Sequence, residues 1–85
     1  MNTIEQIVKN ESLEDIVTVF ALVKATPHLD MIIGRYKPEA TRHGELQRAY
    51  ARLFEMGVLA KGEKGLATKG PNWKAPSFVT ENRYG

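Results

Sequence analysis

The sequence predicts a mainly α-helical fold of three to four helices with a small two-stranded β-hairpin. Apolar residues recur every three to four positions in several segments between Thr3 and Met56, and these segments open with helix-start residues. Gly57 follows the longest segment, and glycine readily takes the left-handed conformation that ends a helix. Two short strand-like segments then flank Gly62–Gly65, which is the pattern of a hairpin.

The length of 85 residues favours a single domain. We expect this domain to span residues 1–85, with a core over about 13–70 and an extended C-terminal tail over 71–85. With 42% hydrophobic residues, the chain can form such a core and does not resemble a disordered segment. It contains no cysteine, which excludes disulfides and thiolate metal sites and fits a reducing cytoplasm.

The amino-terminal segment Met1–Glu5 lacks the basic start and the apolar stretch of a signal peptide. The longest apolar run, Ile16–Val23, is far shorter than the ~20 residues of a membrane span. We therefore expect a cytoplasmic protein that does not enter a membrane.

Two helix starts are predicted in the first 20 residues. Thr3–Gln6 has the spacing of a capping box. Ser12 is a second N-cap candidate, followed by Glu14 and Asp15 in the first turn, where the helix dipole favours negative charge. The β-branched run Ile16–Val19 also fits a buried strand, but the cap and the segment length favour a helix.

A third helix is predicted to start with Thr26 as its cap and Pro27 as its first residue, and to end at Gly34. A short connector follows at residues 36–40, because the residue before a proline is pushed out of helical geometry.

The fourth helix is the longest, with Thr41 as its cap and residues 42–56 as its body. Gly44 would cost about 1 kcal/mol relative to alanine in a helix interior, so a start nearer Gly44 is the alternative. The residues predicted to form its buried stripe are Leu46, Ala49, Tyr50, Leu53 and Phe54. Val58–Lys61 and Leu66–Lys69 are the strand candidates, and Trp73 and Phe78 are expected to dock on the core from the tail.

The segment Arg48–Leu59 resembles the end of a recognition helix running into the first wing strand of the winged helix-turn-helix superfamily. In that superfamily an apolar pair such as Leu53 and Phe54 is followed by glycine and two apolar strand residues. The likeness covers about residues 13–70 and points to no specific family. The short first strand of many winged helices has no clear counterpart near Lys24–Ala25.

The resemblance implies double-stranded DNA binding, with helix 42–56 in the major groove and the wing at residues 61–69 on phosphate. Residues expected to face the bases or the backbone are Arg42, His43, Gln47 and Arg48, and Arg52 of the same helix is also predicted to bind the nucleic acid. Residues expected to neutralise phosphates are Lys61, Lys64 and Lys69 on the wing and Arg35 and Lys37 in the turn. Each of these also fits a simple solubilising charge, and Glu45 argues against DNA because a carboxylate repels phosphate.

Charge is unevenly distributed along the chain, whose net charge is +2. Residues 1–34 contain two basic and five acidic residues, a net charge of −3, and residues 35–85 contain ten basic and five acidic residues, a net charge of +5. The basic half favours a negatively charged partner, although a mixed solvated surface would show the same asymmetry.

The sequence gives little support for catalysis. Its histidines are His28 and His43 and its serines are Ser12 and Ser77, with no Gly-x-Ser-x-Gly setting and no metal-ligand spacing of histidines. Gly62–Gly65 lacks the frame of a phosphate-binding loop. We expect a non-enzymatic protein without cofactor or metal.

Two functions remain open. The first is a small DNA-binding transcriptional regulator, with a homodimer as one possible state. The second is a protein-binding module on the same scaffold, such as an antitoxin, an immunity protein or a phage-encoded modulator of a host protein. The acidic N-terminal half and the tail aromatics Trp73, Phe78 and Tyr84 favour the second, because aromatic residues often anchor interfaces.

Overall fold

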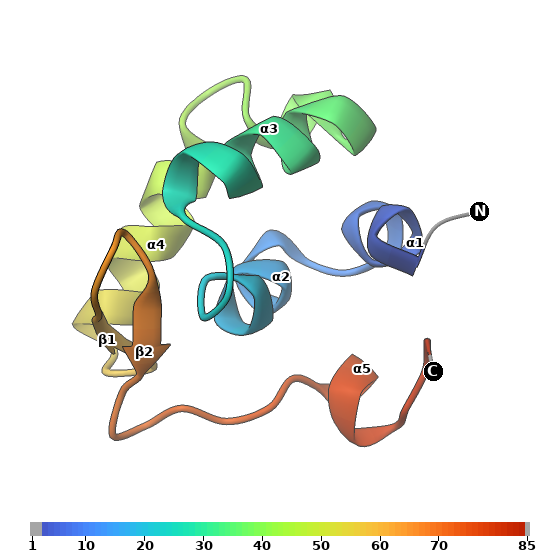
Figure 1. Cartoon of the computed structure of the whole chain (residues 1–85). Helices are drawn as coiled ribbons and strands as arrows, with labels where there is room; N and C mark the ends of the chain where they lie inside the picture. The colour runs from blue at the N-terminus through green and yellow to red at the C-terminus, as the bar shows by residue number, and fades with distance from the viewer. Residues whose placement is uncertain (1–2, 85) are drawn as a thin grey trace.

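The computed structural model describes residues 3–84, in which four helices pack together and a β-hairpin and a short fifth helix follow (Figure 1). The elements are α1 (Thr3–Asn10), α2 (Leu13–Phe20), α3 (Thr26–Tyr36), a 3-10 helix (Pro38–Ala40), α4 (Glu45–Glu55), β1 (Leu59–Lys61), β2 (Ala67–Lys69) and α5 (Ser77–Thr80). This is the mainly helical class with a small hairpin that the sequence predicts. Residues 1, 2 and 85 of the predicted domain lie outside the described residues.

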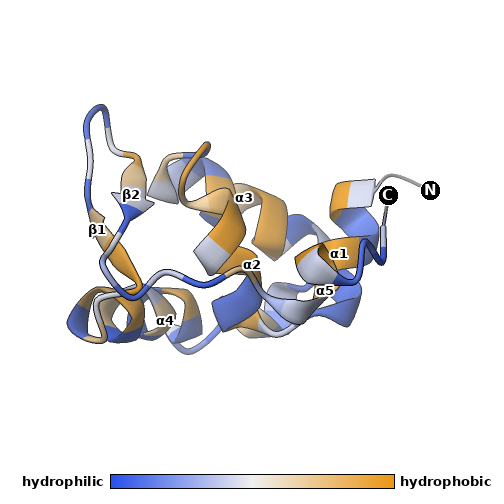
Figure 2. Ribbon diagram, turned by 90° about the horizontal axis from the view of Figure 1, so that it is seen from below, coloured by the Kyte–Doolittle hydropathy of each residue, from blue (hydrophilic) through white to orange (hydrophobic). Residues whose placement is uncertain are grey.

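The apolar core lies where α2, α3 and α4 meet. Ile16 of α2, Ile33 of α3 and Leu46 of α4 are all completely shielded from solvent. Figure 2 shows the apolar stretches of α2 and α3 in the middle of the molecule. Because fully burying such a side chain contributes about 1.5–3 kcal/mol, these contacts hold α4 in place and determine which of its faces stays exposed.

Helix starts follow the predicted caps only in part. Ser12 caps α2 as predicted, since its Oγ accepts a hydrogen bond from the Asp15 N–H at 3.2 Å. The Ile16–Val19 segment is helical, so the strand alternative is excluded. The prediction that Thr26 caps α3 is wrong: Ala25 is the N-cap and Thr26 is already helical. Proline is tolerated one residue later because the N–H groups of the whole first turn lack intrahelical partners.

The predicted end of α3 at Gly34 is also wrong. The helix continues to Tyr36, and the Lys37 N–H donates to the Ile33 carbonyl at 2.7 Å. Tyr36 packs against the core, and this burial outweighs the roughly 1 kcal/mol that glycine costs inside a helix.

The start of α4 confirms the alternative near Gly44. Gly44 is the N-cap with φ +75°, a left-handed conformation that glycine takes readily, and Glu45 is the first helical residue. The cap at Thr41 and the start at residue 42 are therefore wrong, and the Thr41 hydroxyl instead donates to the Pro38 carbonyl at 3.0 Å.

The carboxyl end of α4 is as predicted. Gly57 has φ +76°, and its N–H donates to the Phe54 carbonyl at 3.1 Å. The Val58 N–H donates to the Leu53 carbonyl at 2.9 Å, which completes a Schellman motif. The chain is thereby reversed directly into β1.

The predicted hairpin is confirmed. β1 and β2 pair antiparallel, with Leu59 opposite Lys69 and Lys61 opposite Ala67. Ahead of α3, no strand is assigned in residues 3–84, but the segment after α2 makes one backbone bond to the hairpin, from the Ala67 N–H to the Ala21 carbonyl at 2.9 Å. This bond adds to the burial of Leu59 and Ala67 in the core, which packs the hairpin against the helices.

The extended tail over residues 71–85 is a prediction that needs correction. The segment after β2 runs back past α2, forms α5 and ends on the side of the molecule where α1 lies (Figure 1). Trp73 and Phe78 dock as predicted, since the Trp73 Nε1–H donates to the Thr18 carbonyl at 3.0 Å and Phe78 is 4% exposed. The buried Phe78 explains why a helical turn forms there. With α5, residues 3–84 contain five α-helices instead of three to four.

Candidate nucleic-acid interface

Helix α4 has one buried face and two exposed rows. Its buried residues are Leu46, Ala49 and Leu53. Residues four apart share a helix face, so one exposed row consists of Gln47, Ala51 and Glu55 and the neighbouring row of Arg48 and Arg52. The first row carries one negative charge and no positive charge, so cations are concentrated along one side of the helix.

The segment before α4 is tied to its first turn. The Glu45 carboxylate accepts a hydrogen bond from the His43 backbone N–H at 2.9 Å, and the Arg48 guanidinium donates to the His43 carbonyl at 2.7 Å. The backbone bond from His43 is the largest cause that lowers the pKa of Glu45, so this side chain is ionised at neutral pH. Arg42 and His43 are exposed beside it, so the amino end of α4 presents the arginines Arg42 and Arg48 together with the carboxylate of Glu45.

A groove of about 390 Å³ runs between the amino end of α2 and α4. We call it the charged groove; its lining residues are Ser12, Leu13, Glu14, Glu45, Arg48, Ala49 and Arg52. Arg52 forms an ion pair with Glu14 of α2 at 2.8 Å, and Arg48 lies 3.7 Å from Glu45. The two arginine side chains remain 64% and 66% exposed. Each guanidinium in the groove thus lies against a carboxylate but stays open to solvent.

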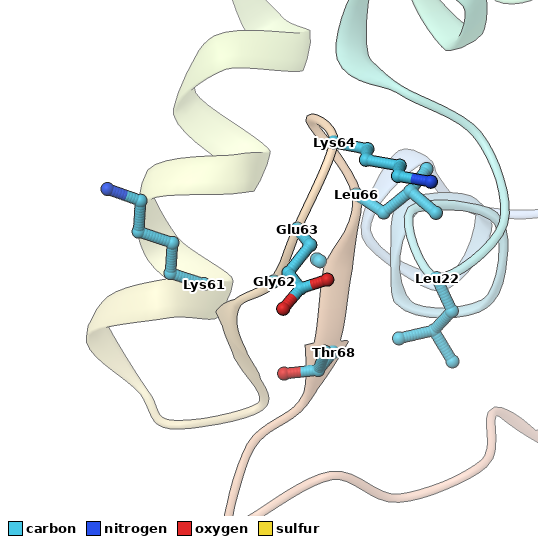
Figure 3. Close-up of a pocket in the computed structure, with 8 residues that line it drawn as sticks. Leu22, Lys61, Gly62, Glu63, Lys64, Leu66 and Thr68 are labelled. Carbon is cyan, nitrogen blue, oxygen red and sulfur yellow. The ribbon is translucent and has the colours of Figure 1, made fainter.

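The three lysines of the hairpin do not form one row. In Figure 3 the Lys61 side chain extends toward α4, whereas the Lys64 side chain points the other way, toward the chain that follows α2. The Lys69 ammonium group lies 4.3 Å from the centre of the Trp73 ring, a cation–π contact with the tail. Lys61 alone among them extends toward α4.

Arg35 and Lys37 are directed elsewhere. The Arg35 guanidinium lies 5.7 Å from the centre of the Tyr36 ring. The Lys37 ammonium group donates to the Glu11 backbone carbonyl at 3.2 Å, in the connection between α1 and α2. The structure therefore gathers Arg42, His43, Gln47, Arg48 and Arg52 along α4, and separates Arg35, Lys37, Lys64 and Lys69 from them.

Phe54 is the clearest departure from the predicted buried stripe, since it is 40% exposed. Its row on α4, shared with Tyr50, faces the hairpin across a pocket of about 200 Å³ that also includes Lys61 and Leu66. The helical period placed Phe54 next to the core, but a three-residue strand is too short to cover it. Phe54 and the neighbouring Met56, which is 55% exposed, leave apolar surface at the carboxyl end of α4.

The Tyr50 hydroxyl is shielded from solvent and has no hydrogen-bond partner of good geometry among residues 3–84. Burial raises the pKa of this hydroxyl, and the nearby Thr26 side chain offsets part of that rise. A shielded polar group without a partner is destabilising.

Sequence reasoning also missed the role of Glu14. Its position in the first turn of α2 was explained by the helix dipole alone, and nothing in the local pattern connects it with Arg52, which lies 38 residues further along the chain. The contact depends on the packing of α2 against α4, which no local spacing reveals.

Comparison of the chain with protein-family models, with curated proteins and with solved structures found no match. None of the helices in the described part of the chain is long and apolar enough to cross a membrane. The function is therefore inferred from the charge, exposure and geometry of α4 and its surroundings.

Proposed function

We propose that the chain is a winged helix-turn-helix protein that binds double-stranded DNA as a transcriptional regulator in the cytoplasm. In this proposal α4 is the recognition helix and the β1–β2 hairpin is the wing. Support comes from the order of elements: α3, a short turn, α4, the glycine at residue 57 and the hairpin. A homodimer of this kind would present its two recognition helices about 34 Å apart.

One observation carries the proposal: the amino end of α4 exposes four residues that suit DNA, while the opposite face of the helix is buried. The four residues are Arg42, His43, Gln47 and Arg48. Arginine can pair with guanine and glutamine with adenine in the major groove.

The ion pairs of the charged groove are compatible with phosphate binding. Exposed ion pairs contribute only about 0–1 kcal/mol, so Arg48 and Arg52 can exchange a carboxylate for a phosphate at little cost. Arg42 and Lys61 take part in none of the ion pairs among residues 3–84. These four cations form the proposed footprint, without Arg35, Lys37, Lys64 and Lys69.

The test is binding to a random-sequence duplex, measured by fluorescence anisotropy at 50 and 200 mM salt. Four phosphate contacts predict a log–log salt slope of about −3.6, or a loss of affinity on the order of 10²-fold between the two conditions. Arg48→Glu should abolish binding, while Lys74→Glu, the same charge reversal in the tail, should change it little. A lack of binding at 50 mM salt would refute the proposal.

A protein-binding module is the second candidate, of the antitoxin, immunity or phage-modulator kind. It is supported by the carboxylates of Glu14, Glu45 and Glu55 around α4 and by the exposed Phe54 and Met56. A stoichiometric protein that co-purifies with the wild type and is lost on Phe54→Ser would favour it over DNA.

The tail aromatics do not support this second candidate as the sequence suggested. Phe78 is buried, and Trp73 and Tyr84 bond to the molecule's own Thr18 and Glu11. Any interface anchor is expected at the carboxyl end of α4 instead.

A further inference from the structure

Glu14 is the one residue of the charged groove that pairs with α4 from another helix. Its carboxylate accepts a hydrogen bond from the Arg52 guanidinium at 2.8 Å, and its side chain is 41% exposed. Arg52 has no other hydrogen bond or ion pair from its side chain among residues 3–84. The orientation of Arg52 along the groove therefore depends on a single exposed carboxylate.

We propose that Glu14 is a built-in competitor of DNA phosphate for Arg52, and that it lowers the affinity of the α4 surface for DNA. This inference rests on the proposed DNA-binding function. When a duplex approaches, Arg52 exchanges the Glu14 carboxylate for a phosphate oxygen, and Glu14 returns to solvent.

Two physical effects make Glu14 a competitor. A guanidinium engages a phosphate best through two parallel N–H bonds. The Glu14 carboxylate already accepts a hydrogen bond from the Arg52 guanidinium, so fewer of its N–H groups are available to a phosphate. The carboxylate also repels an approaching phosphate, and this repulsion acts on every DNA sequence alike. Such a carboxylate lowers the affinity for every duplex by the same factor, so it leaves the discrimination between sites unchanged.

The exposure of the pair indicates that the exchange is easy. Both side chains already contact water, so neither charge has to be moved out of a low-dielectric interior when the pair opens. Glu45 differs, because its carboxylate also binds the His43 backbone N–H and so holds the segment before α4. Glu14 is thus the carboxylate whose removal should release an arginine without altering the local backbone.

The experiment compares Glu14→Gln with Asp15→Asn on the random duplex. Both substitutions remove one negative charge from the first turn of α2, but Asp15 forms no ion pair among residues 3–84. Glu14→Gln should raise affinity at 50 mM salt by about three- to ten-fold, while the salt slope should stay at about −3.6, because Arg52 already contacts a phosphate in the wild-type complex. Asp15→Asn should raise affinity by less.

A double-mutant cycle shows whether Glu14 acts through Arg52. In an Arg52→Gln background, Glu14→Gln should raise affinity no more than Asp15→Asn does. If wild type binds the duplex and Glu14→Gln binds equally or more weakly, or if its gain persists without Arg52, the competitor role is wrong while DNA binding stands. If neither wild type nor Glu14→Gln binds at low salt, both proposals fail. Circular dichroism confirms that each variant is folded.

Discussion

Two glutamate–arginine pairs of almost equal length lie in different surroundings. Glu14 and Arg52 approach to 2.8 Å on the surface between α2 and α4, and Glu11 and Arg83 approach to 2.7 Å beneath the end of the tail. The Glu14 side chain is 41% exposed, whereas that of Glu11 is 6% exposed. Because burial, not length, decides how costly it is to lose a partner, the two pairs should behave differently.

The tail pair belongs to a converging set of bonds. One oxygen of Glu11 accepts from both the Arg83 guanidinium and the Tyr84 hydroxyl, and the Lys37 ammonium group donates to the Glu11 backbone carbonyl. The bond to Glu11 is the largest cause that raises the pKa of the Tyr84 hydroxyl. The tail is therefore part of the folded structure, whereas the ion pair between α2 and α4 stays open to solvent.

Phe78→Ala is the most severe way to test this contrast. It removes a buried aromatic ring that joins the tail to the core, so the free energy of unfolding should fall by about 3–5 kcal/mol. Urea denaturation followed by circular dichroism measures the loss. The exposed Val79→Ala next to it is the control; an equal loss in both variants would mean that the tail is not docked through Phe78.

Glu11→Ala should have the next largest effect. It leaves Arg83 and Tyr84 without their shared partner, and a loss of about 2 kcal/mol is expected after allowing for the partial exposure of Arg83. The same denaturation experiment applies. Stability within experimental error of wild type would show that the tail bonds contribute nothing.

Tyr50→Phe should stabilise the protein, by about 1 kcal/mol, because it removes a shielded hydroxyl that has no hydrogen-bond partner of good geometry among residues 3–84. The raised pKa of Tyr50 means that folding favours the neutral hydroxyl. This contribution is complete below the ordinary pKa near 10 and is lost as pH rises through the higher folded pKa. Wild type should therefore lose stability above pH 10 more steeply than Tyr50→Phe, and parallel pH curves would contradict this.

Glu14→Gln should have the smallest effect on stability, no more than about 0.5–1 kcal/mol, because the pair is exposed. It sharpens the comparison with Glu11, since it disrupts a pair of nearly equal length. Thermal unfolding of the two variants side by side is the measurement. A loss with Glu14→Gln as large as that with Glu11→Ala would remove the distinction between the two pairs.

Local signals explain which parts of the fold could be predicted. The cap at Ser12, the terminator at Gly57 and the hairpin around Gly62–Gly65 each depend on a few consecutive residues, and all three are confirmed. The turn of helix at α5 was missed because burial of Phe78 against distant helices stabilises it. The Glu11 bonds join residues 72 and 73 positions apart, a separation that no local pattern encodes.

In the candidate site, too, features set by neighbouring residues could be predicted, and contacts between distant segments could not. The exposure of Gln47, Arg48 and Arg52 on α4 could be predicted from the helical period, whereas Arg42 and His43 lie in the segment before the helix. Lys37 and Lys69 were assigned to the same surface, but the first donates to Glu11 and the second lies over Trp73. Both contacts are made by chain segments far apart in the sequence, so charge alone could not reveal them.

Trp73 is the only tryptophan in the chain, and its indole N–H is bonded to the Thr18 carbonyl. Intrinsic fluorescence of the wild-type protein is consequently a label-free reporter of one event, the attachment of the tail to α2. A shift in its emission during unfolding marks tail release, and a ligand that docks on the outer face of α4 should leave the emission almost unchanged.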